Sequence, residues 1–218
     1  MRLKSVYQSL IEKYGRQKWW PADNRFEVMV GAILTQNTSW LNVERALDNL
    51  KQANALSPKT ITQTNHDVLA KWLKPSGYFN IKAGRLKQFC YWYLDHGSYD
   101  GLKFKRTDKL REMLLSVKGV GPETADDILL YAFNRKVFVV DAYTRRIFSR
   151  LGLVDESLGY ESLRAVFENE LQKETVKTFN EYHALIVRHG KEVCKTRPSC
   201  DECCLQKKCI QLGVTVIS

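Results

Sequence analysis

Four cysteines near the end of the chain have the spacing of metal ligands. They follow the pattern C-x5-C-x2-C-x5-C: Cys194, Cys200, Cys203 and Cys209. Four thiolates this close together can enclose one 4Fe-4S cluster, for which ligation by four cysteines is the usual arrangement. Zinc is the alternative, but zinc sites more often use two C-x2-C pairs, and this segment has one. We therefore expect an iron-sulfur cluster in the loop 194–209, with Cys204 outside its coordination shell.

A second candidate site is the segment 117–125, with the sequence VKGVGPETA. Gly119 and Gly121 permit a tight turn whose backbone N–H groups can approach a phosphate closely, with a helix N-terminus opening at Pro122 behind them. This pattern predicts a helix-hairpin-helix that grips a nucleic-acid backbone through Lys118, Gly119, Val120 and Gly121. For Gly-x-Gly alone, a plain turn between two helices is the alternative.

Asp141 stands between the apolar segment 137–140 and a helical pattern that follows it. By its position alone, an aspartate here is a helix N-cap. Because it follows the predicted hairpin by 18 residues, counted from Glu123, its carboxylate can also face the sugar of a bound nucleotide. There it would orient water and stabilise an oxocarbenium-like transition state by its charge. We take Asp141 as the candidate catalytic residue.

The charge of the chain agrees with a polyanionic partner. Lys and Arg outnumber Asp and Glu by 34 to 24, which gives a formal net charge of +10. Such a field concentrates nucleic acid around a protein, although charge alone can also serve solubility. No apolar run approaches the roughly 18 residues of a membrane span, and no secretory signal is seen. We expect a cytoplasmic monomer with no membrane partner, nucleoid-associated if bacterial.

The elements that must position these residues are helices. Apolar residues recur at three and four residues, as in Leu86, Phe89 and Tyr93, which places one helix face against a core. Ser57-Pro58 is typical of an N-cap followed by the first helical residue, and Pro122 opens another helix. The strand-like run 137–140 is too short to organise a sheet. The sequence predicts an all-α fold.

Taken together, these motifs resemble the endonuclease III superfamily of helix-hairpin-helix DNA glycosylases, from about residue 20 to residue 209. The resemblance implies that residues 34–38 (LTQNT) enter the duplex where a flipped base was, with Gln36 and Asn37 contacting DNA. Residues 76–80 (SGYFN), followed by Lys82, resemble a second wedge loop carrying Tyr78, and residues 189–191 (HGK) resemble a turn before the cluster. Lys191, Lys195 and Arg197 then suit a phosphate backbone.

The implied activity is base excision on double-stranded DNA: a damaged base is flipped out and its N-glycosidic bond is hydrolysed. We expect two helical lobes with a DNA-binding cleft between them. One is a six-helix domain of residues 19–133 with the hairpin, and the other joins residues 1–18 to 134–218 with the cluster loop.

Two departures from the family pattern matter. Cys194 and Cys200 are separated by five residues where six are commonest, a tolerable variation. Glu123 stands where lyase-competent members carry a lysine that attacks the sugar, and a carboxylate cannot form that Schiff base. We therefore expect a glycosylase without abasic-site lyase activity.

Within the superfamily, the pattern of three tryptophans and Glu123 in this sequence resembles that of the 3-methyladenine glycosylase branch. Trp19 and Trp20, with Trp40 after the LTQNT loop and Glu123 at the lysine position, would form the base pocket. Indoles attract a cationic alkylated purine by cation–π interaction. The alternative for Trp19 and Trp20 is packing of the N-terminal segment. Two other functions stay open: an endonuclease III-type glycosylase and lyase for oxidised pyrimidines, using Lys118 or Lys191, and a non-catalytic iron-sulfur DNA-binding protein.

Overall fold

The computed structural model describes residues 2–17, 19–20 and 22–214, and every regular element in these ranges is a helix. The all-α prediction is confirmed. Residues 137–140 are extended and buried but form no strand in the described ranges. The chain divides into two compact units, residues 22–135 and residues 1–21 with 136–218. No helix of the described ranges is long and apolar enough to cross a membrane.

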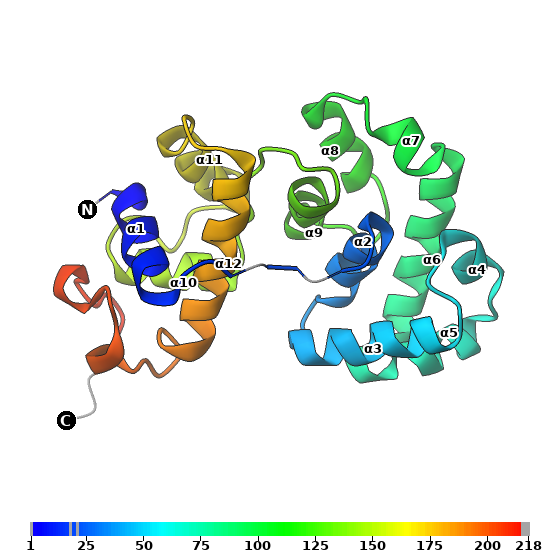
Figure 1. Cartoon of the computed structure of the whole chain (residues 1–218), viewed down its shortest axis with the longest axis horizontal. Helices are drawn as coiled ribbons and strands as arrows, with labels where there is room; N and C mark the ends of the chain where they lie inside the picture. The colour runs from blue at the N-terminus through cyan, green and yellow to red at the C-terminus, as the bar shows by residue number, and fades with distance from the viewer. Residues whose placement is uncertain (1, 18, 21, 215–218) are drawn as a thin grey trace. The chain divides into compact units, whose positions relative to one another are not determined.

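The unit 22–135 is built on α6, a 17-residue helix against which α4 and α5 pack (Figure 1). Its α-helices number eight, against the six expected for residues 19–133, and three of them have six residues or fewer. They are α2 (Arg25–Leu34), α3 (Trp40–Gln52), α4 (Pro58–Gln63), α5 (His66–Leu73), α6 (Phe79–Asp95), α7 (Ser98–Leu102), α8 (Thr107–Leu115) and α9 (Pro122–Asp127). A 3-10 turn, η1 (Lys74–Ser76), precedes α6, and one π-helical turn, η2 (Ile128–Ala132), continues α9.

Local sequence explains where several of these helices begin. Ser57 caps α4 by accepting a hydrogen bond from the Thr60 N–H, and Pro58 fills the first helical position, as predicted. Pro122 opens α9 in the same way. Leu86, Phe89 and Tyr93 of α6 are buried, which confirms the helical face inferred from their spacing, and Cys90 beside them is fully buried as well. Burial raises the pKa of the Cys90 thiol well above its usual range.

The other unit is centred on α12, which packs against α10 and α1 (Figure 1). Its α-helices are α1 (Leu3–Tyr14), α10 (Ala142–Arg150), α11 (Tyr160–Glu170) and α12 (Val176–Glu192), followed by the 3-10 turns η3 (Cys200–Glu202) and η4 (Gln206–Lys208). The HGK segment 189–191 was expected to be a turn, and this was wrong. It is the last part of α12, because the Val193 N–H still reaches back to the His189 carbonyl at 3.0 Å.

An aromatic core fixes the backbone just before Asp141. Phe138 stacks on Phe167 with ring centroids 4.3 Å apart and meets Phe179 and Tyr182 edge to face. Each such pair contributes about 0.5–1.5 kcal/mol beyond the area that it buries. The extended segment 137–140 is therefore held by side-chain packing, which sets where α10 begins.

Candidate functional site

The predicted helix-hairpin-helix is present in the unit 22–135. Helix α8 leads into a turn in which the Val120 N–H donates to the Val117 carbonyl at 3.0 Å, and α9 follows. Arg111 of α8 joins the buried carboxylate of Asp126 in α9 through two hydrogen bonds of 2.6 and 3.1 Å. A two-point bond of this kind fixes direction as well as distance. The two helices therefore hold the turn between them rigidly.

The two glycines of the turn have different roles, which the sequence does not separate. Gly119 has φ +93°, and an added Cβ would lie 2.4 Å from Cγ of Arg85. Gly121 has φ −93°, is exposed, and would meet no atom within 4 Å. Of their neighbours, Lys118 is exposed, whereas the Val120 side chain is buried and belongs to the core. Gly119 is thus required by the fold, and Gly121 leaves a side free for a ligand.

Valine at either glycine tests this difference. Gly119→Val is expected to destabilise the protein by about 1–3 kcal/mol, because a branched residue is strained at positive φ. Gly121→Val should melt as wild type does but bind DNA more weakly, with the slope of log K against log salt smaller by about 0.9 for each phosphate that is no longer neutralised. The measurements are thermal melting and a salt titration of duplex binding. Wild-type affinity and slope in Gly121→Val would reject phosphate binding at this turn.

The two predicted wedge loops carry exposed residues in a left-handed backbone. Asn37 has φ +54° and Tyr78 has φ +46°, with 65 % of Tyr78 exposed. Non-glycine residues are uncommon there, and such strain gathers at functional sites. Gln36 differs from its neighbour: its amide donates to the Gly119 carbonyl and to Thr124 Oγ1, both at 3.0 Å. It therefore supports the hairpin.

Asp141 caps α10 and also faces a histidine. Its Oδ1 accepts from the Thr144 N–H at 2.7 Å and from the Thr144 hydroxyl at 2.8 Å, while Oδ2 lies 3.6 Å from Nε2 of His183 on α12. Burial alone raises the pKa of Asp141, but the nearby His183 and the two bonds from Thr144 outweigh it and lower the pKa below its usual value. The carboxylate is therefore ionised at neutral pH. The structure makes Asp141 the N-cap of α10 and leaves its second carboxylate oxygen facing His183.

Sequence reasoning missed His183, which lies 42 positions after Asp141. It is buried on the apolar face of α12, where a histidine by itself indicates only packing. Helix α12 also contacts Tyr143, two residues after Asp141, through Gly190. Tyr143 lies so close to Gly190 that a Cβ there would be 2.5 Å from the ring. That close approach accounts for the glycine of the HGK segment.

The four predicted metal-ligand cysteines line one pocket. It has about 330 Å³ of space, part of it open solvent, and includes Cys194, Cys200, Cys203, Cys209 and Arg150. Among the described residues, no group of three or more His, Cys, Asp or Glu side chains is arranged to hold a single metal ion. Burial is the main cause that raises the pKa of Cys203 to about 11. The donor set is four thiols of one loop, which is the set that an iron-sulfur cluster uses.

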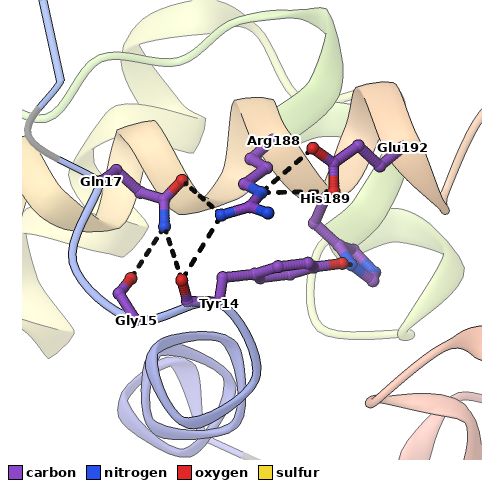
Figure 2. Close-up of polar contacts among 6 residues, drawn as sticks. All are labelled: Tyr14, Gly15, Gln17, Arg188, His189 and Glu192. Carbon is purple, nitrogen blue, oxygen red and sulfur yellow. Dashed lines mark hydrogen bonds and ion pairs between the residues drawn. The ribbon is translucent and has the colours of Figure 1, made fainter.

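The N-terminal segment braces this loop through His189. The Tyr14 hydroxyl lies 2.8 Å from Nδ1 of His189, and Nε2 of the same ring lies 3.5 Å from Sγ of Cys203. Figure 2 shows Tyr14 pointing to His189, with Arg188 bonded to Gln17 on one side and Glu192 on the other. Burial lowers the pKa of His189 to about 4, so the ring is neutral at pH 7.

The predicted base-pocket residues fall in both units. Trp19 and Trp20 are half-buried in the unit that contains Asp141, and Nζ of Lys191 lies 5.8 Å from the centroid of the Trp19 ring. Trp40 opens α3 in the other unit and donates its indole N–H to Glu44 at 2.8 Å. Glu123 is exposed in the first turn of α9. Lys195 and Arg197 are exposed in the cysteine loop.

An all-helical protein with a helix-hairpin-helix and exposed basic residues belongs to the class of helical DNA-binding proteins. Residues 30–173 match the HhH-GPD superfamily of base excision DNA repair proteins, and the chain belongs to that family. A provisionally named DNA repair glycosylase of Methanocaldococcus jannaschii is 47% identical over 210 residues, which cover 94% of each chain. Endonuclease III of Sulfolobus acidocaldarius is 28% identical over 188 residues, 85% of this chain and 82% of its own.

Two solved structures resemble the fold closely. The H. pylori 3-methyladenine DNA glycosylase bound to 1,N6-ethenoadenine aligns with a TM-score of 0.77 at 30% identity, over 88% of this chain and 98% of that one. A non-covalent endonuclease III–DNA complex aligns with a TM-score of 0.81 at 19% identity, over 96% and 94%. At that lower identity, the second likeness concerns the fold alone.

Proposed function

We propose that this chain is a base-excision DNA glycosylase that hydrolyses the bond between deoxyribose and alkylated purines such as 3-methyladenine, without cutting the strand. The observation that carries the proposal is Asp141, a half-buried and ionised carboxylate that α10 and His183 hold in place. Membership of a base-excision family supports the glycosylase activity. The likeness to the H. pylori enzyme supports the choice of alkylated purines.

The proposed reaction is a hydrolysis at the sugar C1′. The C1′–N bond breaks and its electron pair leaves with the base, so positive charge develops on the sugar. Asp141 would stabilise that charge and orient the water that adds to C1′, and the proton of the water would pass to the carboxylate or to solvent. A cationic alkylated purine leaves readily as a neutral base, so no strong general acid is needed. The neutral 1,N6-ethenoadenine must in addition take up a proton, from solvent, as it leaves.

A panel of duplexes with single lesions tests the substrate class. Free base should be released from methylated and 1,N6-ethenoadenine DNA, and the abasic strand should stay intact until heat or alkali cleaves it. Replacing the residue that stacks on the base, whether Trp19, Trp20 or Trp40, by alanine should cost about 1–3 kcal/mol of excision. Trp92, whose ring packs on Phe89 within α6, provides the control. Excision of thymine glycol or mismatched adenine, with none of alkylated purines, would contradict the proposed specificity.

The second candidate is an endonuclease III-type glycosylase and lyase, which the sequence relatives named endonuclease III favour. Glu123 separates the two, because it offers no amine where lyases carry lysine. Borohydride trapping on abasic DNA reads this difference directly. Duplex binding without excision of any lesion would instead indicate a non-catalytic DNA-binding protein.

We further propose that Cys194, Cys200, Cys203 and Cys209 hold one 4Fe-4S cluster. The four thiols line one pocket, and Arg150 donates to the carbonyls of Lys195 and Thr196 and approaches the Cys194 sulfur at 3.5 Å. A bound cluster would supply covalent cross-links to a loop that has little apolar core of its own. The basic residues of that loop, Lys195 and Arg197, would then be presented to phosphates in a fixed arrangement.

Metal analysis of the purified protein checks this assignment. The protein should be brown and contain about four irons per chain, as a 4Fe-4S cluster requires. Cys203→Ala should lose the iron, whereas Cys204→Ala should keep it, since Cys204 does not line the pocket. A colourless protein with one zinc per chain would overturn the cluster.

A further inference from the structure

Lys82 is a buried ammonium that joins two loops of the unit 22–135. Its side chain is 1% exposed, and Nζ donates to the Leu34 carbonyl at 2.8 Å and to the Ser76 carbonyl at 2.6 Å. Burial, and then the nearby Arg85, lowers its pKa to about 8, so the group is mainly cationic at neutral pH. A buried charge is costly unless it is hydrogen-bonded, as this one is. Lys82 thus ties the start of the LTQNT loop to the start of the SGYFN loop.

Arg85, one helical turn further along α6, joins the same framework to the hairpin. Its Nη1 donates to Oε1 of Gln36, and its aliphatic carbons cover Gly119 closely. The Gln36 amide in turn donates to the Gly119 carbonyl and to Thr124. Two cations at positions i and i+3 of one helix therefore contact three loops that are separate in the sequence.

Each of these loops has a left-handed residue within a few positions of the contact. Asn37 follows Leu34, Tyr78 follows Ser76, and Gly119 lies under Arg85. A strained conformation persists only where the surrounding structure fixes it. The exposed Tyr78 ring and the neighbouring Ile81, 65% and 55% exposed, are held out to solvent by this backbone.

We propose that Lys82 and Arg85 are positioning residues that hold the three loops as one preformed surface for extruding the damaged base. The inference rests on the proposed glycosylase function. Base extrusion requires unstacking and unpairing, and a loop that must also become ordered adds to that cost. Because the loops are already fixed, the binding energy offsets only the cost of unpairing and unstacking the base. Neither residue touches the reacting atoms in this role.

The test compares paired and unpaired forms of one lesion. The probe is a duplex with 1,N6-ethenoadenine opposite thymine, and its partner carries the same base in an unpaired bulge, where extrusion costs least. The fluorescence of the ethenoadenine measures base unstacking, and single-turnover kinetics measure excision. The variants are Lys82→Met and Arg85→Met. Lys87→Met is the matched control, since Lys87 also lies on α6 and donates to a carbonyl, that of Thr64, away from the three loops.

We expect Lys82→Met to lower unstacking and excision of the paired lesion by about tenfold or more, and to act within about threefold of wild type on the bulged lesion. Arg85→Met should show the same pattern, and it carries the test if Lys82→Met fails to fold. Lys87→Met should match wild type on both lesions. Equal losses on paired and bulged lesions, or none on the paired lesion, would overturn the inference. Excision by the wild-type protein tests the proposed function separately. A wild type that excises no alkylated purine would overturn the proposed function itself.

Discussion

Asp141→Asn is expected to lower excision by about 10²-fold to 10⁴-fold, as the loss of a positioned acid–base group does, while folding and DNA binding survive. Asparagine is as good an N-cap as aspartate, so the bonds to Thr144 can be kept. What disappears is the negative charge that would face the sugar in the proposed reaction. The measurements are single-turnover excision, thermal melting and duplex affinity on the same preparation.

Asp155→Asn provides the matched control for this substitution. Asp155 accepts from the Ser157 N–H and hydroxyl at 2.8 and 2.7 Å, so like Asp141 it accepts two bonds from one nearby residue, but it caps no helix and lies exposed in a turn. The Asp155→Asn variant should excise at the wild-type rate.

The pH dependence of excision gives a further check. Because the pKa of Asp141 is lowered, the carboxylate should stay ionised between pH 5 and 8, so this group should cause no change of rate in that range. Any loss of rate from its protonation should appear only at lower pH. A fully active Asp141→Asn would leave the residue as a helix cap only.

Glu123→Lys is expected to create strand cleavage where the wild type has none. The side chain is exposed in the first turn of α9, so an amine there can reach solvent and, in a complex, the sugar C1′. Strand nicking and a borohydride-trapped complex should rise at least about tenfold above wild type, since only an amine forms the Schiff base. The substitution puts a cation near a helix N-terminus, which costs about 0.3–1 kcal/mol and leaves the fold intact.

Glu112→Lys is the control for Glu123→Lys. Glu112 lies on α8, the other helix of the hairpin, and is exposed in an ion pair with Lys109. It changes the net charge by the same amount without placing an amine at position 123. Trapping of the wild type on abasic DNA would contradict the prediction and show that another lysine attacks the sugar.

The fold and the positions of the motifs could be predicted because they depend on local patterns. Apolar spacing, the N-cap at Ser57 and the first helical residue Pro122 predicted the helices, and the glycines predicted the hairpin. The HGK segment was misjudged because a glycine usually ends a helix, whereas Gly190 continues one to make room for Tyr143.

The contacts that position the site could not be predicted, because they depend on residues distant in the chain. His183 reaches Asp141 only because α10 packs on α12. A lysine is expected at the surface, and Lys82 is buried only because two loop carbonyls point at one place. Helical periodicity places such side chains on a face but does not reveal their partners.

The unit that contains Asp141 is assembled from both ends of the described chain, and this affects the order of folding. Residues 22–135 are continuous and can fold as soon as they leave the ribosome. Helix α1 can make its contacts only after residues 170 and 182 have been synthesised, because the Leu3 carbonyl accepts from the Tyr182 hydroxyl and the Leu3 N–H donates to Glu170. Once residues 22–135 are folded, a flexible loop between α1 and α12 is replaced by a compact body, and the entropy cost of closing the longest contacts falls. The unit that carries the catalytic candidate is therefore completed after residues 22–135 have folded.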